Sequence, residues 1–64
     1  LSLVTRREME VLSLIARGAT NSEIAAEMVI AETTVKTHVS SLMSKLAARD
    51  RVAMVLVAQR AGIA

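Results

Sequence analysis

The sequence predicts an all-α fold, a compact four-helix domain that contains a helix-turn-helix. Apolar residues recur at helical spacing in four segments, and residues that start or stop helices lie between those segments. The 64 residues include no cysteine, proline or aromatic residue, so aliphatic packing alone must form the core. The predicted helices cover about residues 6–17, 21–28, 32–46 and 51–61.

The composition excludes several classes of protein. The chain has no cysteine and a single histidine, so we expect neither a metal nor another cofactor. Without aromatic residues it lacks the stacking surfaces that bind single-stranded nucleic acids. Clustered carboxylates, an activated nucleophile and a glycine-rich phosphate loop are missing, which argues against an enzyme. No apolar run is long enough to span a membrane, and we expect a cytoplasmic protein.

The first two helices each begin with a capping box. Thr5 is followed three residues later by Glu8, and Thr20 by Glu23, the pattern in which side chain and backbone cap each other. Gly18 ends the first helix, because glycine enters the left-handed conformation without steric cost.

The third helix carries the main functional signal. Residues 29–31 are too short a link for anything but a sharp turn, so the segments on either side form a helix-turn-helix over about residues 20–39. The apolar stripe of the third helix consists of Val35, Val39, Leu42 and Leu46. Its other side has short hydroxyl side chains and two lysines, with no carboxylate after Glu32. Such a face can approach a polyanion closely, and we interpret residues 32–46 as a DNA recognition helix.

Candidate DNA contacts follow from that face. Lys36 is the strongest, since its ammonium can reach a guanine edge, and Thr37 and Ser40 can also contact base edges. The candidates for contact with phosphate are Asn21, Ser22, Thr33, Thr34, Ser41 and Lys45.

Three of these residues have alternative interpretations. Lys45 can instead pair with Glu8 or Glu10 of the first helix, and Thr34 can cap the third. His38 has no nucleophile or metal partner nearby in the sequence, so packing or a phosphate contact explains it better than catalysis.

Charge is distributed unevenly along the chain. Residues 1–32 have a net charge of −2 and residues 33–64 a net charge of +4, which suggests a phosphate-bearing partner for the second half. Arg49 and Arg51 lie beside the start of the fourth helix, where positive charge opposes the helix dipole. We therefore expect them to bind a phosphate or a carboxylate.

The fourth helix is capped by Asp50, ends at Gly62 and is apolar almost all round. One face consists of Val52, Val55, Leu56 and Gln59. The other consists of Ala53, Met54, Val57 and Ala61. A domain this small can bury only one of these faces, and we expect the face with Ala53, Met54, Val57 and Ala61 to form a dimer interface.

Five segments together resemble the LuxR-type helix-turn-helix domain, also called the NarL/FixJ type. They are residues 3–12 (LVTRREMEVL), 21–25 (NSEIA), 34–39 (TVKTHV), 45–46 (KL) and 49–53 (RDRVA). The resemblance covers nearly all of residues 1–64 in order. It implies the C-terminal output domain of a bacterial transcription regulator, which binds DNA as a homodimer through the fourth helix. An upstream receiver or sensor domain, absent from this chain, would control it, and base contacts would map onto Lys36, Thr37 and Ser40.

The chain departs from the family pattern at two positions. Ala31 replaces the serine that usually caps the recognition helix, a loss of about 1 kcal/mol. Ala47 replaces a glycine, and a left-handed backbone there would be strained, so we expect the following loop to differ.

Two other functions fit parts of the sequence. One is a protein-binding helical module that uses the fourth helix, whose binding would be insensitive to salt. The other is a domain like region 4 of a sigma factor, which would leave the fourth helix without a role.

Overall fold

The computed structural model describes residues 3–63 and confirms an all-α domain. The helices are α1 (Arg6–Ala16), α2 (Asn21–Met28), α3 (Glu32–Lys45) and α4 (Arg51–Arg60), and no strand occurs among the described residues. The predicted bounds are right for α2 and one residue too long at the end of the other three helices. Residues 1, 2 and 64, at the ends of the predicted domain, lie outside the description.

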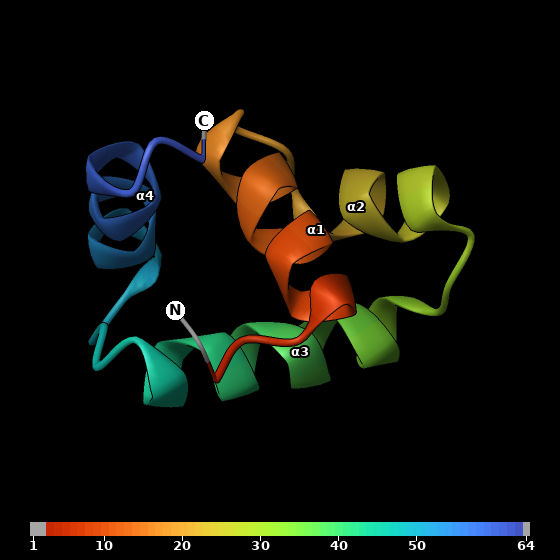
Figure 1. Cartoon of the computed structure of the whole chain (residues 1–64). Helices are drawn as coiled ribbons and strands as arrows, with labels where there is room; N and C mark the ends of the chain where they lie inside the picture. Colours follow the sequence, from red (N-terminus) through yellow and green to blue (C-terminus); the bar gives the residue numbers. More distant parts are fainter. Residues whose placement is uncertain (1–2, 64) are drawn as a thin grey trace.

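α1 is the central helix of the domain. It crosses α3, with α2 and α4 on its two sides (Figure 1). α1 packs against all three other helices, whereas no Cα atom of α2 lies within 8 Å of one in α4. Within residues 3–63, none of the helices has the length and apolar character needed to cross a membrane.

The core is aliphatic, as the composition predicts. α1 contributes Val11, Leu12 and Ile15, and α3 contributes Val35, Val39 and Leu42. The remaining buried apolar residues are Ile24, Ala48, Met54 and Ala58. Each helix therefore buries one side against α1 or its neighbours, which fixes the side that it leaves exposed.

The exposed face of α4 differs from the prediction. The prediction that Met54 lies on an outward dimer face is wrong, because the residue is 0% exposed and belongs to the core. The apolar side chains that α4 does expose are Val52 (70%) and Leu56 (48%). Ala53 and Val57 are half-buried, and Ala61 is exposed. A helix that is apolar all round gives no signal for the side that turns inward, so only packing decides it.

The helix starts agree with the expected caps. Thr5 accepts from the Glu8 backbone N–H at 3.2 Å, and the Glu8 carboxylate accepts from the Thr5 N–H at 2.9 Å. Thr20 and Glu23 repeat the arrangement at 3.1 and 2.8 Å. Ala31, by contrast, gives α3 no side-chain cap. The start of α3 is therefore the one helix start that no side chain caps.

The ends of the four helices all use the same backbone motif. In each, an N–H bonds to the carbonyl five residues earlier: Ala19 to Leu14, Ile30 to Ala25, Ala48 to Met43 and Ile63 to Ala58, at 2.9–3.1 Å. The residue before each donor has positive φ: Gly18, Val29, Ala47 and Gly62, at 91°, 55°, 53° and 72°. The expectation that Ala47 would change this loop is wrong. The motif forms there, and Ala47 adopts the left-handed conformation.

A buried carboxylate ties α1 to α3. Glu8 is 5% exposed, and it accepts hydrogen bonds from the Ser41 hydroxyl at 2.6 Å and the Lys45 ammonium at 2.7 Å. These bonds, together with the one from the Thr5 N–H, lower the pKa of Glu8 from 4.5 to about 2, with Lys45 as the largest cause. Of the two carboxylates that the sequence offers to Lys45, Glu8 and Glu10, the structure pairs it with Glu8.

Glu8 should make stability dependent on pH in the acid range. Its folded pKa of about 2 lies below the ordinary value of 4.5, so its stabilising effect is complete above pH 4.5 and is lost as the pH falls toward 2. In urea unfolding, Glu8→Gln should be less stable than wild type at pH 7, and the difference should shrink across this interval. Glu10→Gln, an exposed carboxylate on the same helix, is the control. A difference that does not vary with pH would contradict the assignment.

Val29→Gly should stabilise the domain. Val29 is 88% exposed with φ at 55°, and a left-handed backbone costs an L-residue roughly 1–2 kcal/mol. Glycine removes this cost and loses some of the gain to backbone entropy, leaving about 0.5–1 kcal/mol. Thermal unfolding would measure the gain. Val52→Gly, the same change at an exposed valine inside α4, should destabilise instead. A lower melting temperature for Val29→Gly would refute the expectation.

Candidate nucleic-acid interface

The outward side of α3 forms one continuous polar face. Because Val35, Val39 and Leu42 are buried against the core, the opposite side of the helix must face solvent. The exposed residues along that side are Thr33, Lys36, Thr37, Ser40 and Ser44. All three residues predicted to contact bases are therefore exposed on one face, which we call the α3 outer face.

Lys36 supplies positive charge on the α3 outer face. It lies in the second turn of the helix, and its side chain is exposed. The ion pairs within 4.0 Å among residues 3–63 involve Arg7 and Lys45, and Lys36 takes part in neither. Its ammonium can therefore meet an external acceptor without breaking an internal salt bridge.

Thr37 has a more restricted chemistry than the sequence indicates. Its hydroxyl donates to the Thr33 carbonyl oxygen at 3.1 Å, one turn back in the same helix. The single hydroxyl proton is thus used within the helix, and the oxygen remains as an acceptor beside the side-chain methyl group. Thr37 is suited to an amino group on a base edge or to a thymine methyl. The Ser40 hydroxyl makes no such bond within residues 3–63.

The residues predicted to contact phosphate lie at three places. Asn21 and Ser22 form the start of α2, with Asn21 half-buried and Ser22 exposed. Thr33 and Thr34 are exposed in the first turn of α3. The remaining two, Ser41 and Lys45, face α1 and bond to Glu8.

The bonds to Glu8 limit what Ser41 and Lys45 can do. A serine hydroxyl has one proton, and that of Ser41 goes to the carboxylate, so none is left for a phosphate. Lys45 has two further N–H groups, but its charge is balanced by Glu8. Contact of these two residues with phosphate stays a prediction, and for Ser41 it requires the hydroxyl to leave Glu8.

Arg51 makes contacts within the domain that the sequence pattern did not predict. Its guanidinium donates to the Asn21 side-chain oxygen and to the Ala19 carbonyl oxygen, each at 2.7 Å. In the sequence, a basic residue at the unfavourable end of a helix predicts a phosphate or carboxylate partner. The partners are instead an amide and a backbone carbonyl, and no sequence rule links residues 30 positions apart.

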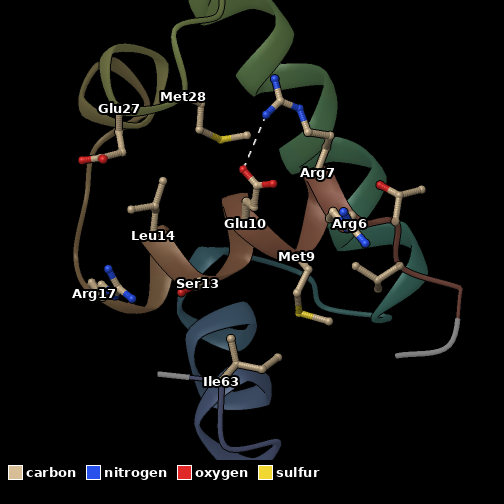
Figure 2. A pocket seen from close by; sticks show the side chains of 12 residues that line it. Arg6, Arg7, Met9, Glu10, Ser13, Leu14, Arg17, Glu27, Met28 and Ile63 are labelled. Atoms are coloured by element: carbon tan, nitrogen blue, oxygen red, sulfur yellow. Dashed lines mark hydrogen bonds and ion pairs between the residues drawn. The ribbon is translucent and has the colours of Figure 1, made fainter.

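A shallow groove of about 870 Å³ lies away from the α3 outer face. It is lined by α1, the segment before it, the end of α2 and Ile63, with no residue of α3 (Figure 2). Its lining is mixed: Arg7 pairs with Glu10 at 3.5 Å, beside half-buried side chains such as Met9 and Leu14. The groove therefore has neither the uniform sign of charge nor the helix geometry of the α3 outer face.

Comparison with known proteins identifies the family. Residues 2–58 match the model of bacterial regulatory proteins of the luxR family. The uncharacterized transcriptional regulatory protein YhcZ of Bacillus subtilis is 54% identical over 55 residues, which cover 86% of this chain and 26% of YhcZ. The response regulator protein VraR of Staphylococcus aureus is 52% identical over 56 residues, covering 88% of this chain and 27% of VraR. VraR of Staphylococcus saprophyticus gives the same values.

The chain spans about a quarter of the length of these curated relatives. The match nevertheless covers nearly all of this chain, including both helices of the helix-turn-helix and the α3 outer face. The family is one of DNA-binding regulatory domains rather than catalytic ones. The chain therefore belongs to the luxR family of bacterial regulatory proteins, as a helix-turn-helix domain of that family.

Proposed function

We propose that the domain binds double-stranded DNA sequence-specifically, with α3 in the major groove. The observation that carries the proposal is the α3 outer face, which combines an exposed lysine with short hydroxyl side chains and has no carboxylate after Glu32. A B-DNA major groove is about 12 Å wide and admits one α-helix. Short side chains let the helix backbone come close to the bases, which long or acidic side chains would prevent.

The chemistry of the face divides the contacts. Lys36 would donate to the O6 and N7 acceptors of guanine. Thr37, with its proton committed to the helix backbone, would accept from an amino group or touch a thymine methyl. Ser40 keeps a hydroxyl that can donate or accept. Because these roles differ, the three positions would read different bases.

Backbone contacts would hold α3 in place. Asn21 and Ser22 at the start of α2, with Thr33 and Thr34 at the start of α3, offer side-chain donors near two helix N-termini, where the dipole favours a phosphate. The net charge of +4 on residues 33–64 adds a long-range attraction for DNA.

A homodimer formed through α4 would place two recognition helices on one DNA. The exposed Val52 and Leu56 support this part of the proposal, since they are large apolar side chains on one helix with no covering element among residues 3–63. The matched segment makes up 27% of the response regulator protein VraR, which supports an output domain under the control of an upstream receiver or sensor domain. We place this regulator in the cytoplasm.

Lys36→Ala should weaken DNA binding and relax its specificity. A duplex selected from a randomised pool would be compared with its scrambled sequence by fluorescence anisotropy at several salt concentrations. The substitution should cost roughly 1–3 kcal/mol on the selected duplex and much less on the scrambled one.

The control for Lys36→Ala is Arg17→Ala, which removes one positive charge from the groove beside α1. Equal losses on both duplexes would mean that Lys36 binds phosphate rather than a base. Binding that does not respond to salt would favour a protein-interaction module instead of a DNA-binding domain.

Leu56→Gln should weaken binding to a duplex with two half-sites by roughly tenfold or more, because each copy loses apolar burial at the interface. Affinity for a single half-site should not change. Ala61→Gln, on the face chosen from the sequence alone, is the matched control and should bind both duplexes like wild type. The reverse pattern would move the interface to the Ala61 side of α4.

A further inference from the structure

Arg51 joins two helices whose backbones do not come close to each other. It is the first residue of α4, and its two terminal nitrogens donate to the Asn21 side-chain oxygen and the Ala19 carbonyl oxygen, each at 2.7 Å. No Cα of α2 lies within 8 Å of one in α4. The guanidinium thus connects the start of α4 to the segment that enters α2.

The bond to Arg51 also fixes the orientation of the Asn21 amide. A guanidinium has donors only, so the atom of Asn21 that faces it must be the oxygen. The NH₂ group of Asn21 then remains to donate elsewhere. Without Arg51 the side chain could turn its oxygen toward a phosphate, where two negative ends would repel each other.

The location of Arg51 is hard to explain by the helix alone. A positive charge at a helix N-terminus is unfavourable, because it opposes the helix dipole. Two short charge-assisted hydrogen bonds, to groups in a different part of the fold, offset that cost. Val52 follows directly in the sequence, so the same turn of α4 carries part of the exposed apolar face.

We infer that Arg51 is a positioning residue for DNA binding: it holds the Asn21 amide so that its NH₂ group donates to a backbone phosphate. This inference rests on the proposed DNA-binding function. Through the same bonds, the start of α4, beside the proposed dimer face, is held at a fixed place relative to the phosphate-contacting end of α2.

Salt dependence separates positioning from direct contact. A cation that binds a phosphate itself releases a counterion, and its removal lowers the slope of log affinity against log salt by about one. Asn21 is neutral, so losing its contact lowers affinity and leaves the slope unchanged. A positioning role for Arg51 therefore predicts a weaker complex with the wild-type slope.

The test is a double-mutant cycle with Arg51→Ala, Asn21→Ala and both together. Affinity for a short random-sequence duplex would be measured by fluorescence anisotropy at several salt concentrations, and folding by thermal unfolding. Each single variant should lose affinity roughly three- to tenfold, and the double variant no more than either single variant. Arg17→Ala, which removes an exposed positive charge from the groove beside α1, is the control for net charge.

A conservative variant covers the case in which Arg51→Ala does not fold. Arg51→Lys keeps the charge and most of the stem but cannot reach two acceptors with a planar fork. It should lose affinity with an unchanged salt slope, like the alanine variant.

Three outcomes would overturn the inference. Additive losses, or a slope lower by about one, would mean that Arg51 binds phosphate directly. Wild-type affinity in a folded but less stable Arg51 variant would make the residue purely structural. If wild type itself binds no duplex at low salt, the proposed function fails, and the inference fails with it.

Discussion

The structure depends on the apolar contact between α1 and α3. Val11, Leu12 and Ile15 face Val35, Val39 and Leu42 in a core without aromatic side chains, cysteine or metal ligands. Since α3 buries this side, its opposite side is left to solvent, and that is where Lys36, Thr37 and Ser40 lie. The polar partner of the contact is Glu8, whose bonds to Ser41 and Lys45 fix the far half of α3 against α1. One interface thus both stabilises the domain and orients the face proposed to read DNA.

The four helices end in the same backbone motif, which keeps the connections between them short. All four end in a left-handed residue followed by an apolar residue that packs inward, namely Ala19, Ile30, Ala48 and Ile63. Glycine occupies two of the left-handed positions, while Val29 and Ala47 accept steric cost at the other two. One of these costly positions is the turn of the helix-turn-helix, and the helix after that turn lacks a side-chain cap. The local backbone is therefore least favourable just before the proposed recognition helix, and tertiary packing must hold the start of that helix in place.

Charge is used for two distinct purposes in the domain. Lys45 donates to the Glu8 carboxylate, and Arg51 donates to Asn21 and Ala19. These bonds connect segments that are far apart in the sequence. Lys36 is exposed and pairs with no carboxylate within 4.0 Å among residues 3–63, so it is available to a ligand. Net charge along the chain cannot separate these two groups, because both consist of the same residue types in the basic half.

Local signals in the sequence predict the four helices, the caps of α1, α2 and α4, the two glycine stops and the polar face of α3, because capping, glycine stops and amphipathic spacing act within one or two turns. The side of α4 that faces outward depends on tertiary packing. The helix is apolar all round, so its residue pattern favours neither side, and only the neighbouring helices bury Met54 rather than Leu56. Tertiary packing likewise decided the partners of Lys45, Ser41 and Arg51, whose bonds join residues 30 or more positions apart. Such long-range partners depend on how helices cross, and helix crossing is set by the packing of the whole core rather than by any local pattern.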